Sequence, residues 1–143
     1  MFTTAESITG GLISSYITNF PSVSTVFWGG FITYSNDSKN RLLGVSLSDI
    51  EKYGAVSKEI ALQMAIGALK QSSVDYALSI TGYAGPFSQG DRDPVGTVYI
   101  GLCDRYGRAH VEKKFFVGER NSVRNAARDA AIVLLRKFIL EVE

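Results

Sequence analysis

Apolar residues recur at helical spacing in several stretches of this chain, and short runs of β-branched and aromatic residues lie between them. The helical pattern predicts helices over residues 12–20, 36–44 and 48–54, from 57 onward, and from 119 to about 142. The β-type runs predict strands at 31–34, 75–80, 95–103 and 109–116. Asn36, Ser48 and Ser57 are the expected N-caps. Because strands alternate with helices and one hairpin is indicated, the pattern predicts a mixed α/β sheet covered by helices on both faces.

The composition indicates one domain that comprises residues 1–143. No repeat, low-complexity tract or proline- and serine-rich linker divides the chain. Fifteen basic and fourteen acidic residues leave a net charge of +1, which gives no bulk electrostatic basis for binding nucleic acid or an anionic membrane. No stretch approaches the roughly twenty apolar residues that cross a bilayer, and the N-terminal residues lack the pattern of a signal peptide.

The single cysteine and the single histidine limit the chemistry further. Cys103 cannot form an intrachain disulfide, so we expect a protein of the reducing cytoplasm. Its sequence context suggests a small apolar residue of a strand. His110 has no second histidine or cysteine at ligand spacing, so we expect no metal site.

Three turns rich in small residues are candidates for a binding site. "TAESITGG" (4–11) precedes a helix, whose first N–H groups could stabilise an anion, or it is simply a helix-start turn. "TGYAGP" (81–86) follows a predicted strand, where ligands gather in α/β sheets. "PVGTV" (94–98) could bring Thr97 back to the same crevice.

Two groups of side chains suggest chemistry. Ser24, Tyr34 and Lys39 flank one predicted strand, and a lysine whose pKa burial has lowered can activate a serine. An exposed lysine is the ordinary alternative. Arg120, Arg124 and Arg128 share one face of the last helix, as a solvated basic face or as a phosphate clamp.

The chain resembles the CinA C-terminal domain family across essentially its whole length. The resemblance rests on six blocks in order and at matching spacing: "TAESITGG", "GGFITYSNDSKNRLLGV", "GAVSKEIALQMAIGAL", "SITGYAGP", "PVGTVYI" and "GERNSVRNAARDAA". It implies a three-layer α/β/α sandwich with a mixed, mainly parallel five-stranded sheet. It also implies hydrolysis of the carboxamide of a small-molecule mononucleotide, nicotinamide mononucleotide, to nicotinate mononucleotide and ammonia, with no cofactor.

The resemblance assigns roles to individual residues. It implies a Ser/Lys dyad in which Ser24 is the nucleophile and Lys39 the base, with Tyr34 supporting both by hydrogen bonding. The positions implied to bind the nucleotide and to stabilise the oxyanion are Ser7, Thr9, Gly10, Gly11, Thr81, Gly82 and Arg120.

The chain departs from the family pattern in three places. Ile8 stands where members usually carry cysteine, which the dyad does not need. The loop 87–93 is bulkier than usual, and Asp93 replaces a lysine, which bears on substrate fit. Met1 lies three residues before "TAES", where members commonly have a fuller first strand, and a homo-oligomer could cover that edge. The alternatives are a non-catalytic nucleotide-binding module and a structural or assembly domain.

Overall fold

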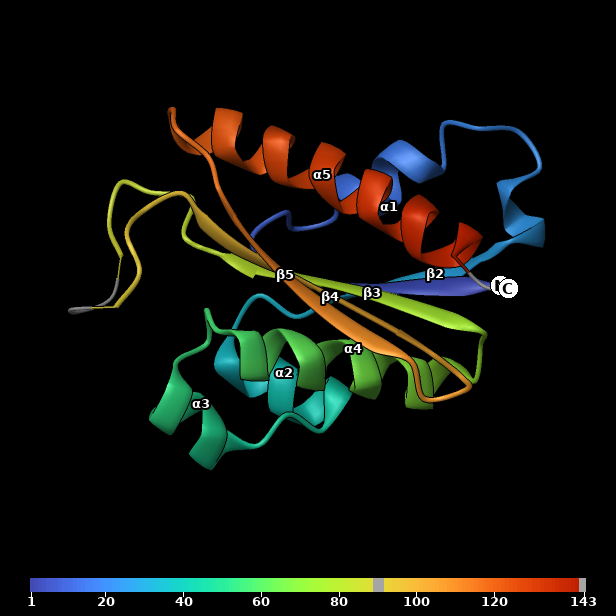
Figure 1. Ribbon diagram of the computed structural model, residues 1–143, viewed down its shortest axis with the longest axis horizontal. Helices are drawn as coiled ribbons and strands as arrows, with labels where there is room; N and C mark the ends of the chain where they lie inside the picture. Colours follow the sequence, from blue (N-terminus) through green and yellow to red (C-terminus); the bar gives the residue numbers. More distant parts are fainter. Residues whose placement is uncertain (89–91, 142–143) are drawn as a thin grey trace.

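Within residues 1–88 and 92–141, which the computed structural model describes, five strands form one sheet in the order β2-β1-β3-β4-β5 (Figure 1). The strands are β1 (Phe2–Glu6), β2 (Phe27–Ile32), β3 (Tyr76–Gly82), β4 (Thr97–Asp104) and β5 (Ala109–Phe115). β1 pairs in parallel with β2 and β3, whereas the β3–β4 and β4–β5 pairs are antiparallel. The predicted α/β/α fold with a mixed sheet is confirmed. The sheet is evenly mixed among these strands, however, rather than mainly parallel.

Helices form the two outer layers. The helices are α1 (Leu12–Ile17), α2 (Asn36–Leu43), α3 (Leu47–Tyr53), α4 (Lys58–Ser72) and α5 (Arg120–Leu140), and a 3-10 turn η1 (Val23–Thr25) precedes β2. Figure 1 shows α1 and α5 on one face of the sheet and α2, α3 and α4 on the other. One apolar cluster fills each gap, and Ile80 and Val123 belong to the first while Ala5 and Met64 belong to the second. Cys103 is buried in the second cluster as predicted.

Several predicted boundaries need correction. The first helix ends at Ile17 rather than at 20, and the strand expected at 31–34 lies at Phe27–Ile32. The last helix is described to Leu140, and its expected end at 142 lies outside the described residues. The helix end shifts by three residues and the strand start by four, since sequence patterns define the type of an element better than its boundaries.

Two of the three predicted N-caps are wrong by one or two residues. The side chain of Ser35, not of Asn36, accepts the Ser38 N–H at the start of α2. Ser46, not Ser48, caps α3. Ser57 caps α4 as predicted. Because Asn36 is freed from capping, its side chain is available to the pocket described below.

A glycine brings α2 close to α4. A Cβ at Gly67 would lie 2.0 Å from the carbonyl oxygen of Leu43, so the two helix backbones meet where no side chain fits. Gly44 then ends α2 with a φ of 69°, in the left-handed region. This close contact fixes α2 beside the carboxyl end of the sheet, with Lys39 on its inner face.

Candidate active site

The loops that follow β1, β2 and β3 meet at one edge of the sheet. These three strands are parallel neighbours, so their carboxyl ends lie side by side. Ser7 follows β1, Tyr34 follows β2, and Gly82 ends β3. This edge is where α/β sheets bind ligands, and it opens onto a pocket of about 270 Å³.

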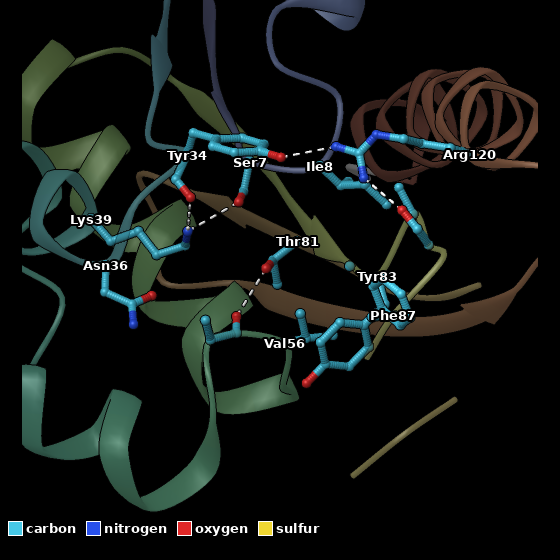
Figure 2. A pocket seen from close by; sticks show the side chains of 14 residues that line it. Ser7, Ile8, Tyr34, Asn36, Lys39, Val56, Thr81, Tyr83, Phe87 and Arg120 are labelled. Carbon is cyan, nitrogen blue, oxygen red and sulfur yellow. Dashed lines mark hydrogen bonds between the residues drawn. The ribbon is translucent and has the colours of Figure 1, made fainter. Parts of the chain in front are cut away.

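Lys39 lines this pocket, and its side chain is only 1% exposed. Its Nζ donates hydrogen bonds to Ser7 Oγ at 3.0 Å, to the Thr33 carbonyl at 2.8 Å and to the Tyr34 carbonyl at 3.4 Å (Figure 2). All three acceptors are neutral oxygens, so no carboxylate at these contacts offsets the cost of burying an ammonium. Burial lowers the pKa of Lys39 from 10.5 to about 8. Lys39 can therefore exchange a proton with the Ser7 hydroxyl near neutral pH.

The structure does not bring Ser24 to Lys39. Ser24 is exposed in the 3-10 turn before β2, whereas Tyr34 and Lys39 follow β2. A six-residue strand spans about 20 Å. This placement contradicts Ser24 as the partner of Lys39. The serine that contacts Lys39 is Ser7, which the family resemblance implied to bind the nucleotide.

Tyr34 and Arg120 meet at the mouth of the pocket. The Arg120 guanidinium donates to the Tyr34 hydroxyl at 3.0 Å and to the Gly85 carbonyl at 2.7 Å. Tyr34 is 61% exposed, and its contact with Lys39 runs through its backbone carbonyl rather than its hydroxyl. The hydroxyl is thus oriented toward Arg120 instead of the Ser7–Lys39 pair. In Figure 2 the Arg120 guanidinium lies at the end of the pocket opposite Lys39.

The turn after β1 does not offer its helix N-terminus to a ligand. The fully buried Glu6 carboxylate accepts the N–H groups of Gly11, Ile13 and Ser14 at 2.9–3.2 Å and the Ser14 hydroxyl at 2.6 Å. The donors at the start of α1 are thereby satisfied internally, which contradicts the prediction that they stabilise a bound anion. Thr9, Gly10 and Gly11 do not line the pocket.

Of the other two predicted turns, 81–86 lines the pocket, whereas 94–98 lies behind it. Thr81 and Gly82 line the pocket, and the Thr81 hydroxyl also donates to the Ala55 carbonyl at 2.9 Å. Thr97 is buried behind the wall, where its carbonyl accepts the Tyr83 N–H at 3.0 Å. Thr97 therefore supports the turn after β3 and does not reach the pocket.

The predicted site residues that line the pocket are Ser7, Tyr34, Lys39, Thr81, Gly82 and Arg120. The lining residues that sequence reasoning missed are Ile8, Asn36, Ala55, Val56, Tyr83, Ala84, Gly85 and Phe87. Asn36 is the polar side chain among them whose position was readable, since it lies three residues before Lys39 and therefore on the same helix face. Most of the others, Ile8, Tyr83, Ala84 and Gly85, come from the predicted turns 4–11 and 81–86.

The negative charge that Asp93 brings to the loop 87–93 is paired with Lys113. The Asp93 carboxylate accepts hydrogen bonds from Lys113 Nζ at 2.8 Å and from the Tyr99 hydroxyl at 2.5 Å. These bonds lower the pKa of Asp93, so its charge is held on β4 and β5 rather than in the pocket. Residues 89–91 of this loop lie outside the described residues.

The family model of the CinA C-terminal domain matches residues 1–139. The chain belongs to this family. Among curated relatives, the CinA-like protein of Solibacter usitatus is 48% identical over 135 residues, which cover 94% of this chain and 32% of that protein. The nicotinamide-nucleotide amidohydrolase PncC of Enterobacter agglomerans is 46% identical over 138 residues, covering 96% of this chain and 84% of that protein.

Solved structures of the family share the fold. A CinA superfamily protein of Escherichia coli superposes with a TM-score of 0.92 at 33% identity, over 96% of this chain and 79% of that one. The competence damage-inducible protein A of Klebsiella pneumoniae gives 0.95 at 28% identity, over 99% and 88%. The chain spans about a third of the length of the Solibacter relative and of the competence-damage inducible proteins of Caldicellulosiruptor saccharolyticus and Alkaliphilus oremlandii. No helix in residues 1–88 or 92–141 is long and apolar enough to cross a membrane.

Proposed function

We propose that this chain is an amidohydrolase that cleaves the carboxamide of nicotinamide mononucleotide, with Ser7 as the nucleophile and Lys39 as the general base. The observation that carries the proposal is the 3.0 Å hydrogen bond between Lys39 Nζ and Ser7 Oγ at the bottom of the pocket. The substrate class comes from the name of the Enterobacter agglomerans relative, which the chain covers over most of its length.

The protonation state of Lys39 suits it to this role. With a pKa of about 8, about one Lys39 side chain in ten is neutral at pH 7. An unperturbed lysine would be neutral in about one case in three thousand at this pH. A neutral amine 3.0 Å from a hydroxyl is within the distance that a general base needs.

The reaction follows from this pair in two halves. Neutral Lys39 takes the Ser7 proton while Oγ attacks the carboxamide carbon, and the tetrahedral intermediate collapses as Lys39 returns the proton to the departing ammonia. Water, deprotonated by the same amine, then hydrolyses the Ser7 ester and releases nicotinate mononucleotide. The balance is one amide plus one water to one carboxylic acid and ammonia, and no cofactor takes part.

Arg120 is the proposed contact for the substrate phosphate. Its guanidinium lies at the mouth of the pocket and can exchange its bonds to Tyr34 and Gly85 for phosphate oxygens. The phosphate would then be at one end of the substrate and the carboxamide at Ser7, at the other end. Assembly into a homo-oligomer stays a prediction, which the mass of the particle in solution would test.

The test is ammonia release from nicotinamide mononucleotide by the wild type and by three variants. We expect Ser7→Ala and Lys39→Met to lose release by at least about 10³-fold, since each removes half of the pair. Ser24→Ala is the matched control and should keep wild-type activity. Loss in Ser24→Ala with full activity in Ser7→Ala would overturn the assignment, and no release by a folded wild type would favour the non-catalytic binding module.

A further inference from the structure

Three arginines at consecutive turns of α5 have three different sets of partners. Arg120 contacts Tyr34 and Gly85 at the pocket. Arg128 pairs with the adjacent Asp129 and lies over the ring of Tyr16. Arg124, which lies between them on the helix, has other partners. The three arginines therefore need not share a function, although they share a helix face.

Arg124 holds the segment that directly follows Ser7. Its Nε donates to the Ile8 carbonyl at 3.0 Å, and its Nη2 donates to the Thr9 carbonyl at 3.1 Å. Its third contact, from Nη1 to the Asn121 side chain at 3.2 Å, anchors the guanidinium on its own helix. A planar fork can hold two successive carbonyls in fixed orientations, which a single ammonium cannot do.

A second charged side chain, Glu6, holds the turn at its other end. The buried Glu6 carboxylate precedes Ser7 and accepts four hydrogen bonds from Gly11, Ile13 and Ser14. Glu6 thus holds the end of the turn at residues 11–14, and Arg124 holds its start at Ile8 and Thr9. The Arg124 guanidinium lies beside Gly10, since a Cβ at Gly10 would be 3.5 Å from its Nη2, in ordinary van der Waals contact.

The orientation of these peptide units has a chemical consequence. A carbonyl directed at Arg124 turns the N–H of the same peptide unit the other way, and the unit between Ile8 and Thr9 is held like this. Within the described residues, the N–H groups of Ile8 and Thr9 have no hydrogen-bond acceptor. Both residues follow Ser7 directly in the chain, but only Ile8 of the two is among the residues that line the pocket. A backbone N–H next to a nucleophile is a usual donor to an oxyanion, so the Ile8 N–H is the candidate donor.

We propose that Arg124 is a positioning residue, which holds the carbonyls of Ile8 and Thr9 so that Ser7 Oγ and the adjacent Ile8 N–H are aligned for attack. This rests on the proposed function of Ser7. Within residues 1–88 and 92–141, the hydrogen bonds of Arg124 go to the two carbonyls and to Asn121, and Arg124 does not line the pocket. Arg124 is therefore proposed to act on the chemical step through the loop and to leave substrate binding to other residues.

The experiment compares kcat and KM of Arg124→Gln and Arg124→Lys with those of the wild type. A displacement of about 1 Å at a nucleophile costs about 10²-fold in rate, so we expect kcat to fall by about that factor in both variants while KM stays within about threefold. Arg124→Lys keeps the positive charge, but its single ammonium group cannot reproduce the two hydrogen bonds of the guanidinium. Arg128→Gln, one turn further along the same helix, is the matched control and should leave both constants unchanged.

Chemical rescue separates positioning from mere stability. Millimolar guanidinium ion should raise kcat of Arg124→Ala at least about tenfold, because the ion can occupy the space that the side chain leaves. It should not raise kcat of Arg128→Ala. Unchanged kcat in Arg124→Gln would overturn the proposal. A rise in KM with unchanged kcat would also overturn it, by placing Arg124 in substrate binding. A kcat loss that guanidinium does not rescue, matched by a lower urea midpoint, would reduce Arg124 to a stabilising contact.

A second readout does not need turnover of the mononucleotide. The rate at which a fluorophosphonate labels Ser7 reports the alignment of Oγ directly, and we expect it to fall by about 10²-fold in Arg124→Gln. If the wild type is labelled but releases no ammonia, the proposed substrate is wrong and the labelling rates still decide the role of Arg124. Equal labelling of wild type and Arg124→Gln, or no labelling of wild-type Ser7, would overturn the positioning proposal.

Discussion

The ammonium group of Lys39 donates a hydrogen bond to the hydroxyl of Ser7 at 3.0 Å, across 32 residues of sequence. Ser7 comes from the turn after β1, and Lys39 comes from α2, which follows the neighbouring parallel strand. The pair is buried at the carboxyl end of the sheet, where a pocket of about 270 Å³ gives access to it. Four predictions rest on this contact and on the residues around it.

The first concerns the pH dependence of activity. Because burial lowers the pKa of Lys39 to about 8, kcat/KM should rise about tenfold per pH unit below this value and level off above it. The measurement is ammonia release between pH 6 and 10. A profile that is flat across pH 8 would exclude Lys39 as the base.

The second concerns stability, where Lys39 should act in the opposite direction. The pKa of Lys39 is about 8 in the folded state and 10.5 for an unperturbed side chain, as in the unfolded chain, so below pH 8 folding buries a charge that prefers water. Lys39→Met should raise the free energy of unfolding at pH 7, by at most about 3 kcal/mol. Between pH 8 and 10.5 the unfolded wild-type chain binds more protons than the folded one, so the free energy of unfolding of the wild type rises with pH. The difference in this free energy between Lys39→Met and the wild type therefore becomes smaller.

Urea unfolding of both proteins at pH 7 and pH 10 measures this second effect. A Lys39→Met variant that is less stable than the wild type at pH 7 would show that the three hydrogen bonds of Lys39 outweigh the burial of its charge.

The third prediction concerns Arg120. Arg120→Ala should raise KM for nicotinamide mononucleotide by about 10–100-fold, the effect of losing a charge-assisted contact, with a smaller effect on kcat. Activity on the nucleoside without phosphate should change little. The matched control is Tyr34→Phe, which removes one partner of the guanidinium and keeps the guanidinium itself. An unchanged KM in Arg120→Ala would place the phosphate elsewhere.

The fourth prediction concerns Glu6. Glu6→Gln keeps the size of the side chain but removes the charge that accepts four hydrogen bonds at the start of α1. Hydrogen bonds to a buried charge contribute more than neutral ones, so we expect a loss of about 2–3 kcal/mol in the free energy of unfolding, measured by urea titration. Asp37→Asn, which breaks an exposed pair with Arg41, should change stability by less than about 0.5 kcal/mol. Equal effects of the two substitutions would contradict the role of Glu6.

The sequence by itself determined the alternation of helices and strands, the mixed sheet, and the turns that line the pocket. Periodicity and turn residues are local properties, so α4 and the burial of Cys103 could be predicted from neighbours in the chain. Lys39, Tyr34 and Arg120 could be selected as candidates because their residue types and spacing carry chemistry. Caps failed by a residue or two, as at Ser35, because adjacent polar residues offer nearly equivalent hydrogen bonds. The end of the first helix failed by three residues, at Ile17 instead of 20.

Only the tertiary structure decided which serine contacts Lys39. Ser24 is nearer in sequence, but β2 lies between them as an extended strand and keeps the two apart. Ser7 is brought to Lys39 by the parallel pairing of β1 with β2 and by the close contact of α2 with α4 at Gly67. The same holds for Glu6, whose carboxylate occupies the helix start that a ligand was expected to use. Such contacts depend on strand order and helix packing, which join residues far apart in the chain and leave no periodic signal in the sequence.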